Sequence, residues 1–212
     1  MKIAEGIPRL GWVIAFLGAA TIMTLAYTSL RGTRSTPVPE HLEPVSAVPD
    51  FQLLDQTGNP FGLSDLKGKI WVANFIFTRC KGPCPVMSSR MAELNTSVKR
   101  AGKGLELVSF SVDPDFDRPE VLSEYASKLG AEPSKWKFLT GTKEQIQDIV
   151  VKGLLQPLAK EPDGTPAHST RFVLVDAKGR LRGFQDGNDP EVVQKLLMDI
   201  GDLMRESPPT QP

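Results

Sequence analysis

The chain has 212 residues, 40% of them hydrophobic, and its 25 lysines and arginines balance 25 aspartates and glutamates. This length accommodates one globular domain with an ordinary hydrophobic core and an additional segment. Nucleic-acid-binding proteins usually have a clustered surplus of basic residues, so the charge balance argues against that class, and we expect no nucleic-acid partner.

The additional segment is at the N-terminus. Residues 11–30 contain no charged side chain, and a helix of this length spans about 30 Å, the thickness of the hydrocarbon core of a bilayer. Trp12 and Tyr27 lie near its two ends, where interfacial aromatic residues are common. The sequence therefore predicts a short flank at 1–10 and one transmembrane anchor at 11–30.

A cleaved signal peptide is the alternative for this segment. Its apolar region is usually shorter and is followed by a small-x-small cleavage site, which Ala26-Tyr27-Thr28 matches poorly. A short flank and a large C-terminal domain fit a signal anchor with an exported domain. The segment is not rich in Arg and Ser as a transit peptide is. We therefore predict a single-pass protein of the bacterial inner membrane with its C-terminal domain in the periplasm.

A proline-rich stretch follows the predicted anchor. Residues 31–49 are rich in Arg, Thr and Ser and contain Pro37, Pro39, Pro44 and Pro49. This composition predicts a stiff, extended tether, in which His41 is expected to be solvated and without a role. We predict that the folded domain extends over 50–205 and that 206–212 is a disordered tail.

The first half of the domain centres on one buried strand. Phe51–Leu54 reads as a strand that enters a turn, and a second short strand follows it. Ile70–Phe77 is nearly all apolar, which is typical of a central strand covered on both faces. Apolar residues at spacings of three and four predict a helix over Val86–Lys99. Cys80 and Cys84 lie between this strand and this helix.

Strands and helices alternate through the second half. The remaining predicted elements are a strand at Leu105–Val112, a helix at 117–129, a strand at Lys137–Thr140, a helix at Lys143–Val151, strands at Phe172–Asp176 and Leu181–Gln185, and a helix at Glu191–Met204. Asp117 is expected to cap its helix in a capping box with Glu120. Ala177-Lys178-Gly179-Arg180 is typical of a hairpin. The pattern predicts an α/β domain whose mixed central sheet, partly parallel and partly antiparallel, is flanked by helices.

The two cysteines are the candidate chemical centre. Both lie at a strand-to-helix turn, where the helix dipole favours thiolate over thiol. Cys80 and Cys84 can act as a redox pair, in which one thiolate attacks and the other resolves, or as ligands of one soft metal ion such as Cu(I). A static disulfide across so short a loop would add little stability. The spacing alone does not separate the redox interpretation from the metal interpretation.

His168 is the second candidate, and it is one of only two histidines. It lies in Pro166-Ala167-His168-Ser169-Thr170, just before a predicted strand. A loop at the start of a strand is an unusual place for a core histidine. The residues leave open whether His168 is a ligand, a catalytic group or an incidental surface imidazole.

Two further groups of residues are expected to be structural. Asp113, Asp115 and Asp117 alternate as in a calcium-binding loop, but an arginine occupies the position of the required glycine. Capping and turn formation therefore account for them. Met87 and Met91 could bind metal through their thioethers, but their helical spacing favours packing in the core.

Several segments together resemble the Sco/SenC family of membrane-anchored copper proteins. The matching segments, in the order found in the family, are 74–85 with both cysteines, Ser111-Val112-Asp113-Pro114, 138–142, and His168-Ser169-Thr170 before a strand ending in Asp176. The resemblance covers about residues 48–205. It implies a thioredoxin-like fold and copper bound by Cys80, Cys84 and His168.

The resemblance also implies a role in maturing the dinuclear copper (CuA) site of cytochrome c oxidase. This role would be performed by copper delivery to the copper-bearing subunit or by reduction of its thiols, and the copper donor stays open. Two thiolates suit Cu(I), and an added imidazole allows Cu(II) as well. Two such close thiols in an oxidising compartment are expected to form a disulfide when no metal is bound.

One departure keeps other functions open. Gly164-Thr165-Pro166 precedes His168, and thioredoxin-like reductases place a similar segment opposite their cysteines. A membrane-anchored thiol-disulfide oxidoreductase would need Cys80 and Cys84 but not His168. A thiol peroxidase or redox sensor on the same fold would need one activated cysteine and would turn over peroxide.

Overall fold

The computed structural model describes Met23 and residues 39–80, 82, 84–98, 104–162 and 164–206. The predicted anchor at 11–30 and the predicted tail at 206–212 lie almost wholly outside these residues. Within the part of the chain that is described, no helix has both the length and the apolar character needed to cross a membrane. The chain divides into two units, Met1–Thr36 and Pro37–Pro212, and the fold below is that of the second unit.

A mixed sheet of eight strands, as counted over the described residues, forms the centre of this unit, in the order β1-β10-β9-β4-β5-β6-β2-β3. These strands are β1 (Ser46–Ala47), β2 (Gln52–Asp55), β3 (Pro60–Gly62), β4 (Ile70–Ile76), β5 (Leu105–Ser111), β6 (Trp136–Thr140), β9 (Arg171–Val175) and β10 (Arg180–Asp186). The neighbours β4, β5 and β6 are parallel, and the other pairs are antiparallel. All seven residues of β4 are buried, as predicted for a central strand.

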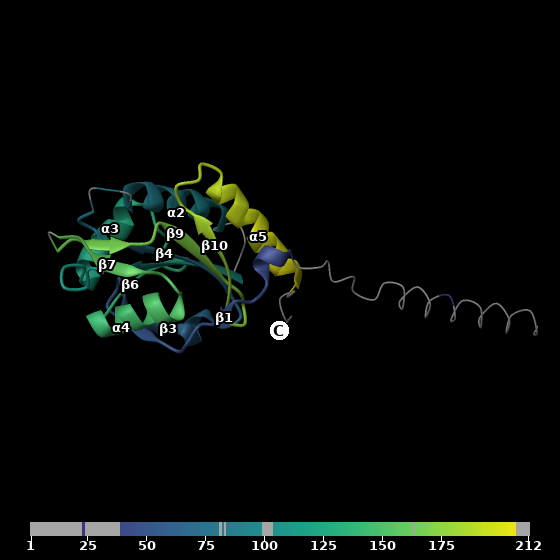
Figure 1. Cartoon of the computed structure of the whole chain (residues 1–212), viewed down its shortest axis with the longest axis horizontal. Coiled ribbons are helices and arrows are strands. Elements are labelled where there is room, and N and C mark those ends of the chain that lie inside the picture. The colour runs from purple at the N-terminus through teal and green to yellow at the C-terminus, as the bar shows by residue number, and fades with distance from the viewer. Residues whose placement is uncertain are drawn as a thin grey trace, which may run out of the picture. The chain divides into compact units, whose positions relative to one another are not determined.

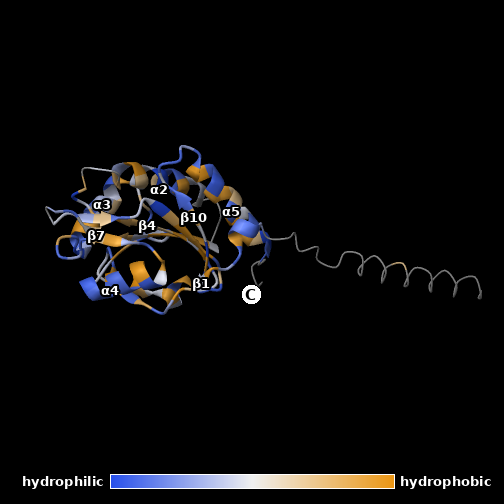
Figure 2. Cartoon of the chain, viewed as in Figure 1, coloured by the Kyte–Doolittle hydropathy of each residue, from blue (hydrophilic) through white to orange (hydrophobic). Residues whose placement is uncertain are grey.

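Helices cover both faces of the sheet (Figure 1). α2 (Cys84–Val98), α3 (Pro119–Lys128) and α5 (Val192–Glu206) pack on one face. α4 (Lys143–Gln147) and the π-helical turn Asp148–Gly153 pack on the other. Figure 2 shows hydrophobic residues concentrated in the strands and on the helix faces toward them. The predicted α/β architecture with a mixed, helix-flanked sheet is therefore confirmed.

The two faces of β4 belong to two separate cores. Val72 and Ile76 pack in the core under α2, α3 and α5, while Trp71 and Phe75 pack in the core on the α4 side. This division follows from the two-residue period of a strand, which sends successive side chains to opposite faces. A continuous apolar run in the sequence is what a strand between two cores requires.

The strands and helices predicted after residue 50 are present with small shifts at their ends. The helix predicted at Lys143–Val151 is α-helical only to Gln147 and continues as a π-helical turn. The predicted hairpin turn has Gly179 in the left-handed region, with a φ of 74°, which glycine adopts without steric cost. α2 begins two residues earlier than predicted, so that Cys84 is its first residue.

A second hairpin, which the sequence did not predict, precedes β9. β7 (Leu158–Lys160) pairs with β8 (Pro166–His168) in a separate two-stranded sheet, with Leu158 opposite His168. The segment before β9 was expected to be a loop, but His168 is the last residue of β8. Strands of three residues are too short to show the alternation by which a strand is recognised.

Part of the range predicted as tether is folded in the described residues. Glu40–Leu42 forms a 3-10 turn, β1 pairs with β10, and Leu42 is fully buried. The Nε–H of Arg182 donates a hydrogen bond to the Leu42 carbonyl oxygen. His41, expected to be without a role, places Nε2 2.9 Å from Oδ1 of the buried Asp199 on α5. Two buried apolar residues, Leu42 and Val48, and a few polar contacts attach this segment, and the prolines around it hide that signal.

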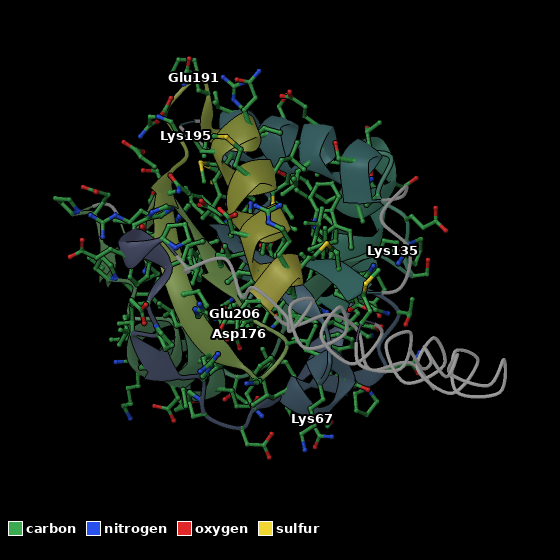
Figure 3. The ribbon with its side chains drawn as sticks, turned by 90° about the vertical axis from the view of Figure 1, so that its right-hand side faces the viewer. Lys67, Lys135, Asp176, Glu191, Lys195 and Glu206 are labelled. Carbon is green, nitrogen blue, oxygen red and sulfur yellow. The ribbon has the colours of Figure 1, made fainter. Side chains whose placement is uncertain are left out.

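A buried ion-pair cluster joins the end of β9 to the end of α5. Figure 3 shows Asp176 and Glu206 near the C-terminal end of α5, with Glu191 and Lys195 near its other end. The guanidinium of Arg182, which is 1% exposed, lies 2.8 Å from Asp176 and 2.6 Å from Glu206. Asp176 is one of the residues that carry the family resemblance, and its contacts assign it to this cluster, at the opposite end of β9 from His168.

The burial of Leu42 leads to a prediction on stability. We expect Leu42→Ala to lower the free energy of unfolding by about 2–5 kcal/mol, because it removes a fully buried side chain and leaves a cavity. Denaturant unfolding of a fragment that begins at residue 37 measures this. Val45→Ala is the control, because Val45 is 55% exposed and its truncation should change stability by less than about 0.5 kcal/mol. Equal effects of the two substitutions would contradict the attachment of this segment.

Candidate metal centre

The two cysteines lie at different depths between β4 and α2. The Cys80 N–H donates to the Phe77 carbonyl oxygen at 3.1 Å, which closes a turn directly after the strand. Cys84 begins α2 and is 1% exposed, whereas Cys80 is partly exposed. Both cysteines are free thiols. The outer sulfur is therefore accessible to a partner, and the inner one is covered by protein.

His168 approaches the inner cysteine from the β7–β8 hairpin. Its Nε2 lies 3.1 Å from Sγ of Cys84, and its Nδ1 lies 2.8 Å from the carbonyl oxygen of Ser169. A carbonyl oxygen only accepts, so Nδ1 carries the proton and the neutral ring presents the lone pair of Nε2 to the sulfur. The Phe77 ring meets the imidazole edge-on, with centroids 5.8 Å apart. This is the tautomer in which a histidine binds a metal through Nε2.

Burial determines the protonation of these groups. Burial, and to a smaller extent a hydrogen bond with Cys80, raises the pKa of the Cys84 thiol to about 12. Burial also lowers the pKa of His168. The expectation that the helix dipole would favour thiolate is therefore wrong for Cys84, because loss of solvation outweighs the dipole. Both groups are neutral at pH 7 in the metal-free protein, and a bound metal must displace the thiol proton.

A groove of about 730 Å³ opens beside Cys80. Phe77, Arg79 and Cys80 line it together with residues of the β7–β8 hairpin, among them His168. The Gly164-Thr165-Pro166 segment is also among those hairpin residues. This segment and Cys80 therefore line the same groove.

The structure brings the three predicted ligands to one place but does not preform a complete site. Cys84 and His168 are in contact, and Cys80 lines the groove together with His168. Over the described residues, no group of three or more His, Cys, Asp or Glu side chains is arranged to hold a metal ion. The donor chemistry, two sulfurs and one unprotonated imidazole nitrogen, fits copper in either oxidation state.

Acidic residues of the β5–α3 loop, expected to form caps and turns, support the cysteine segment instead. The N-cap of α3 is Arg118, without a side-chain cap, so the predicted capping box of Asp117 and Glu120 is wrong. The Asp117 carboxylate accepts hydrogen bonds from Thr78, and Asp113 pairs with Arg79 at 2.5 Å. The signal in the sequence was that polar residues directly follow two neighbouring strands.

A close contact holds the histidine segment against α2. The N–H of Gly187 donates to the Thr170 carbonyl oxygen at 2.9 Å, and a Cβ at this glycine would lie 2.5 Å from that oxygen and 2.0 Å from Sδ of Met87. Met87 is one turn after Cys84, and Thr170 is two residues after His168. Only glycine permits this approach. Met87 and Met91 are buried in the core, as predicted.

Comparison with known proteins identifies similar chains. The SCO1/SenC family model matches residues 39–204. The SCO1 protein homolog of Bacillus subtilis is 31% identical over 156 residues, which cover 72% of this chain and 80% of that protein. Protein SenC of Rhodobacter capsulatus is 31% identical over 153 residues, which cover 70% of this chain and 66% of that protein.

Solved structures of the same group have the same fold. A SCO1/SenC family lipoprotein from Bacillus anthracis superposes with a TM-score of 0.70 at 36% identity, covering 76% of this chain and 97% of the other. BsSco, described as having a disulfide switch and as a member of the Sco family of cytochrome c oxidase assembly proteins, gives 0.68 at 30% identity, with 76% and 95% covered. Copper-bound yeast Sco1 gives 0.61 at 28%, with 74% and 89% covered. The mixed α/β fold thus matches the thioredoxin-like Sco structures.

The different depths of the cysteines predict different reactivity. We expect iodoacetamide to modify Cys80 of the reduced, metal-free protein first, because Cys84 is buried and its thiol pKa is raised to about 12. Peptide mass spectrometry over a time course measures the two rates. Unfolding in guanidinium is the control and should make the two rates similar. Faster modification of Cys84 in the folded protein would contradict the depths described here.

Proposed function

The chain belongs to the SCO1/SenC family, and on that premise we propose that it is a copper chaperone. It binds one copper ion, its cargo, through Cys80, Cys84 and His168, and it assists maturation of the CuA site of cytochrome c oxidase. The partner is the copper-bearing subunit of the oxidase. Support for copper comes from the copper-bound yeast Sco1, and support for the oxidase comes from the description of BsSco.

The contact between Cys84 and His168 is the observation that carries this proposal. A redox pair needs only two sulfurs, yet an imidazole nitrogen with a free lone pair lies 3.1 Å from the inner sulfur. The hydrogen bond to Ser169 holds the ring in that tautomer. Sulfur donors suit Cu(I), and the imidazole extends the donor set toward Cu(II). Cys80, at the groove, is the ligand that a client protein reaches first.

A thiol-disulfide oxidoreductase is the second candidate, because the cysteines differ in depth. In that reaction the Cys80 thiolate attacks a client disulfide, and Cys84 then resolves the mixed disulfide. The protein ends with a Cys80–Cys84 disulfide, and the client ends with two thiols. The partly exposed Cys80 and the β7–β8 hairpin in the same groove suit this reaction as well. This reaction requires only the two sulfurs, whereas copper binding uses the imidazole as a third ligand, which makes His168 the residue that separates the two functions.

We further propose that residues 11–30 anchor the protein in the bacterial inner membrane and that the domain faces the periplasm. The uncharged stretch of membrane-spanning length supports this proposal. The exported domain would then share a compartment with the copper-bearing part of its client.

Copper binding by single variants tests the ligand set. We expect the reduced domain (residues 37–212) to bind about one copper, and Cys80→Ser or Cys84→Ser to abolish tight binding, because the thiolate is the ligand. His168→Ala should weaken Cu(II) binding by at least about tenfold and Cu(I) binding less, because Cu(II) prefers a ligand set that includes nitrogen. Competition titrations with each oxidation state measure these constants.

The matched control for the imidazole is His41→Ala, which removes the other histidine and should leave copper binding unchanged. Wild-type copper affinity in either cysteine variant would contradict the ligand assignment. Full restoration of oxidase activity by His168→Ala in a deletion strain at limiting copper would favour the oxidoreductase.

Protease accessibility tests the membrane topology. In cells with a permeabilised outer envelope, we expect protease to release a soluble fragment by cutting near Arg31 or Arg34, in the stretch between anchor and domain. Immunoblotting of soluble and membrane fractions measures the release. A mature N-terminus found by mass spectrometry directly after Ala26 would show a cleaved signal peptide and would overturn the anchor.

A further inference from the structure

The backbone of β4 loses its strand partner just before the cysteines. Pairing with β5 extends to Ile76, whose carbonyl oxygen accepts from the Val112 N–H at 2.8 Å. The chain then leaves the sheet, and among the described residues no strand pairs with Thr78. Its N–H instead donates to the Asp117 carboxylate at 3.1 Å. A side chain therefore takes the place of the missing strand, two residues before Cys80.

Asp117 is completely buried and accepts from three donors. Besides the Thr78 N–H, these are the Thr78 hydroxyl at 2.5 Å and the Ser111 hydroxyl at 2.6 Å. A buried carboxylate is costly unless hydrogen bonds compensate it, and here every donor comes from the end of β4 or the end of β5. The contacts therefore tie the exit of one strand to the exit of its neighbour.

The contacts close into a ring around the loop. The Ser111 hydroxyl, which donates to Asp117, also accepts from the Asp113 N–H at 3.2 Å. The Asp113 carboxylate in turn pairs with Arg79 at 2.5 Å. Thr78 and Arg79 are consecutive, so both residues before Cys80 are held by the same loop. The Arg79 pair is solvent-exposed and worth little by itself, which leaves the buried Asp117 as the stronger of the two contacts.

The α3 helix lacks the cap that this aspartate would ordinarily supply. Asp117 lies one residue before the N-cap position, where Arg118 makes no side-chain cap. A local rule of helix capping is broken, and the carboxylate is directed to the cysteine segment instead. Such departures from local rules are expected where a residue serves a site.

We propose that Asp117 is the positioning residue of the cysteine motif, which holds Thr78 and thereby fixes Cys80 in the groove that it lines together with His168. Asp117 touches neither copper nor client and acts through the backbone before Cys80. The proposal adds to the proposed function, because it names the residue that sets the geometry of the outer ligand. It applies equally to copper binding and to disulfide exchange, since both need Cys80 in place.

The first test uses the alkylation rate of Cys80 to detect a change in its position, and it needs no copper. In a Cys84→Ser background, which leaves Cys80 as the only thiol, we expect Asp117→Asn to change the alkylation rate of Cys80 at saturating pH by at least about threefold, because an amide cannot accept all three donors. The control is Asp199→Asn, which alters a buried aspartate bonded to His41 and Gln185, and it should leave the rate within twofold. If Asp117 only stabilised the fold, Asp117→Asn and Asp199→Asn would change the Cys80 alkylation rate equally.

The second test measures Cu(II) binding with both cysteines present. Loss of an outer contact that orients a ligand commonly weakens metal binding by about ten- to hundredfold, and we expect Asp117→Asn to weaken Cu(II) binding by about tenfold. Thr78→Val removes one donor with little change in shape and should act in the same direction. The double variant should lose no more than the larger single effect, because both substitutions break one contact.

The outcomes separate the two proposals. If the wild-type protein binds no copper, the proposed function fails, and the alkylation series still decides the role of Asp117. If Asp117→Asn does not fold, Thr78→Val decides it. Two results would overturn the proposal. In the first, Asp117→Asn leaves both the Cys80 alkylation rate and the Cu(II) affinity within twofold of the protein that keeps Asp117. In the second, Asp117→Asn and Asp199→Asn have equal effects.

Discussion

The site depends on β4, a strand buried along its whole length and paired on both sides. Its neighbour β5 is parallel to it, so the segments that follow Ile76 and Ser111 leave the sheet at the same edge. Its other neighbour, β9, is antiparallel, so the segment that precedes Arg171 arrives at that edge as well. Strand order and direction thus bring the cysteines, the β5–α3 loop and the histidine segment together (Figure 1).

Burial rather than the helix dipole decides the chemistry of the inner cysteine. A helix N-terminus stabilises a nearby negative charge by typically about 0.3–1 kcal/mol when exposed, whereas desolvation in a core disfavours the charge more strongly. The Cys84 pKa of about 12 reflects that balance. The inner thiol therefore stays protonated until a metal ion or a disulfide partner replaces the proton. Cys80, which is partly exposed, is the cysteine that a partner reaches first.

Much of the fold was predictable from the sequence because its signals are local. The apolar run at 70–77 indicated a strand between two cores, and spacings of three and four indicated the helices. Both cysteines are adjacent to those signals, so their place at the strand-to-helix turn followed directly. The β7–β8 hairpin was missed because its strands are too short for any period to be visible, and the burial of Leu42 was missed because prolines surround it.

The sequence by itself determined the α/β class, the central strand and the position of Cys80 and Cys84 at its end, since each depends on neighbouring residues. His168 was a candidate from its rarity and from the family resemblance, but its contact with Cys84 joins residues 84 positions apart. The pairing of Asp117 with Thr78 likewise joins residues 39 positions apart. Only the tertiary structure decided these contacts, because the order and direction of the strands determine which strand ends meet, and no local pattern encodes that order.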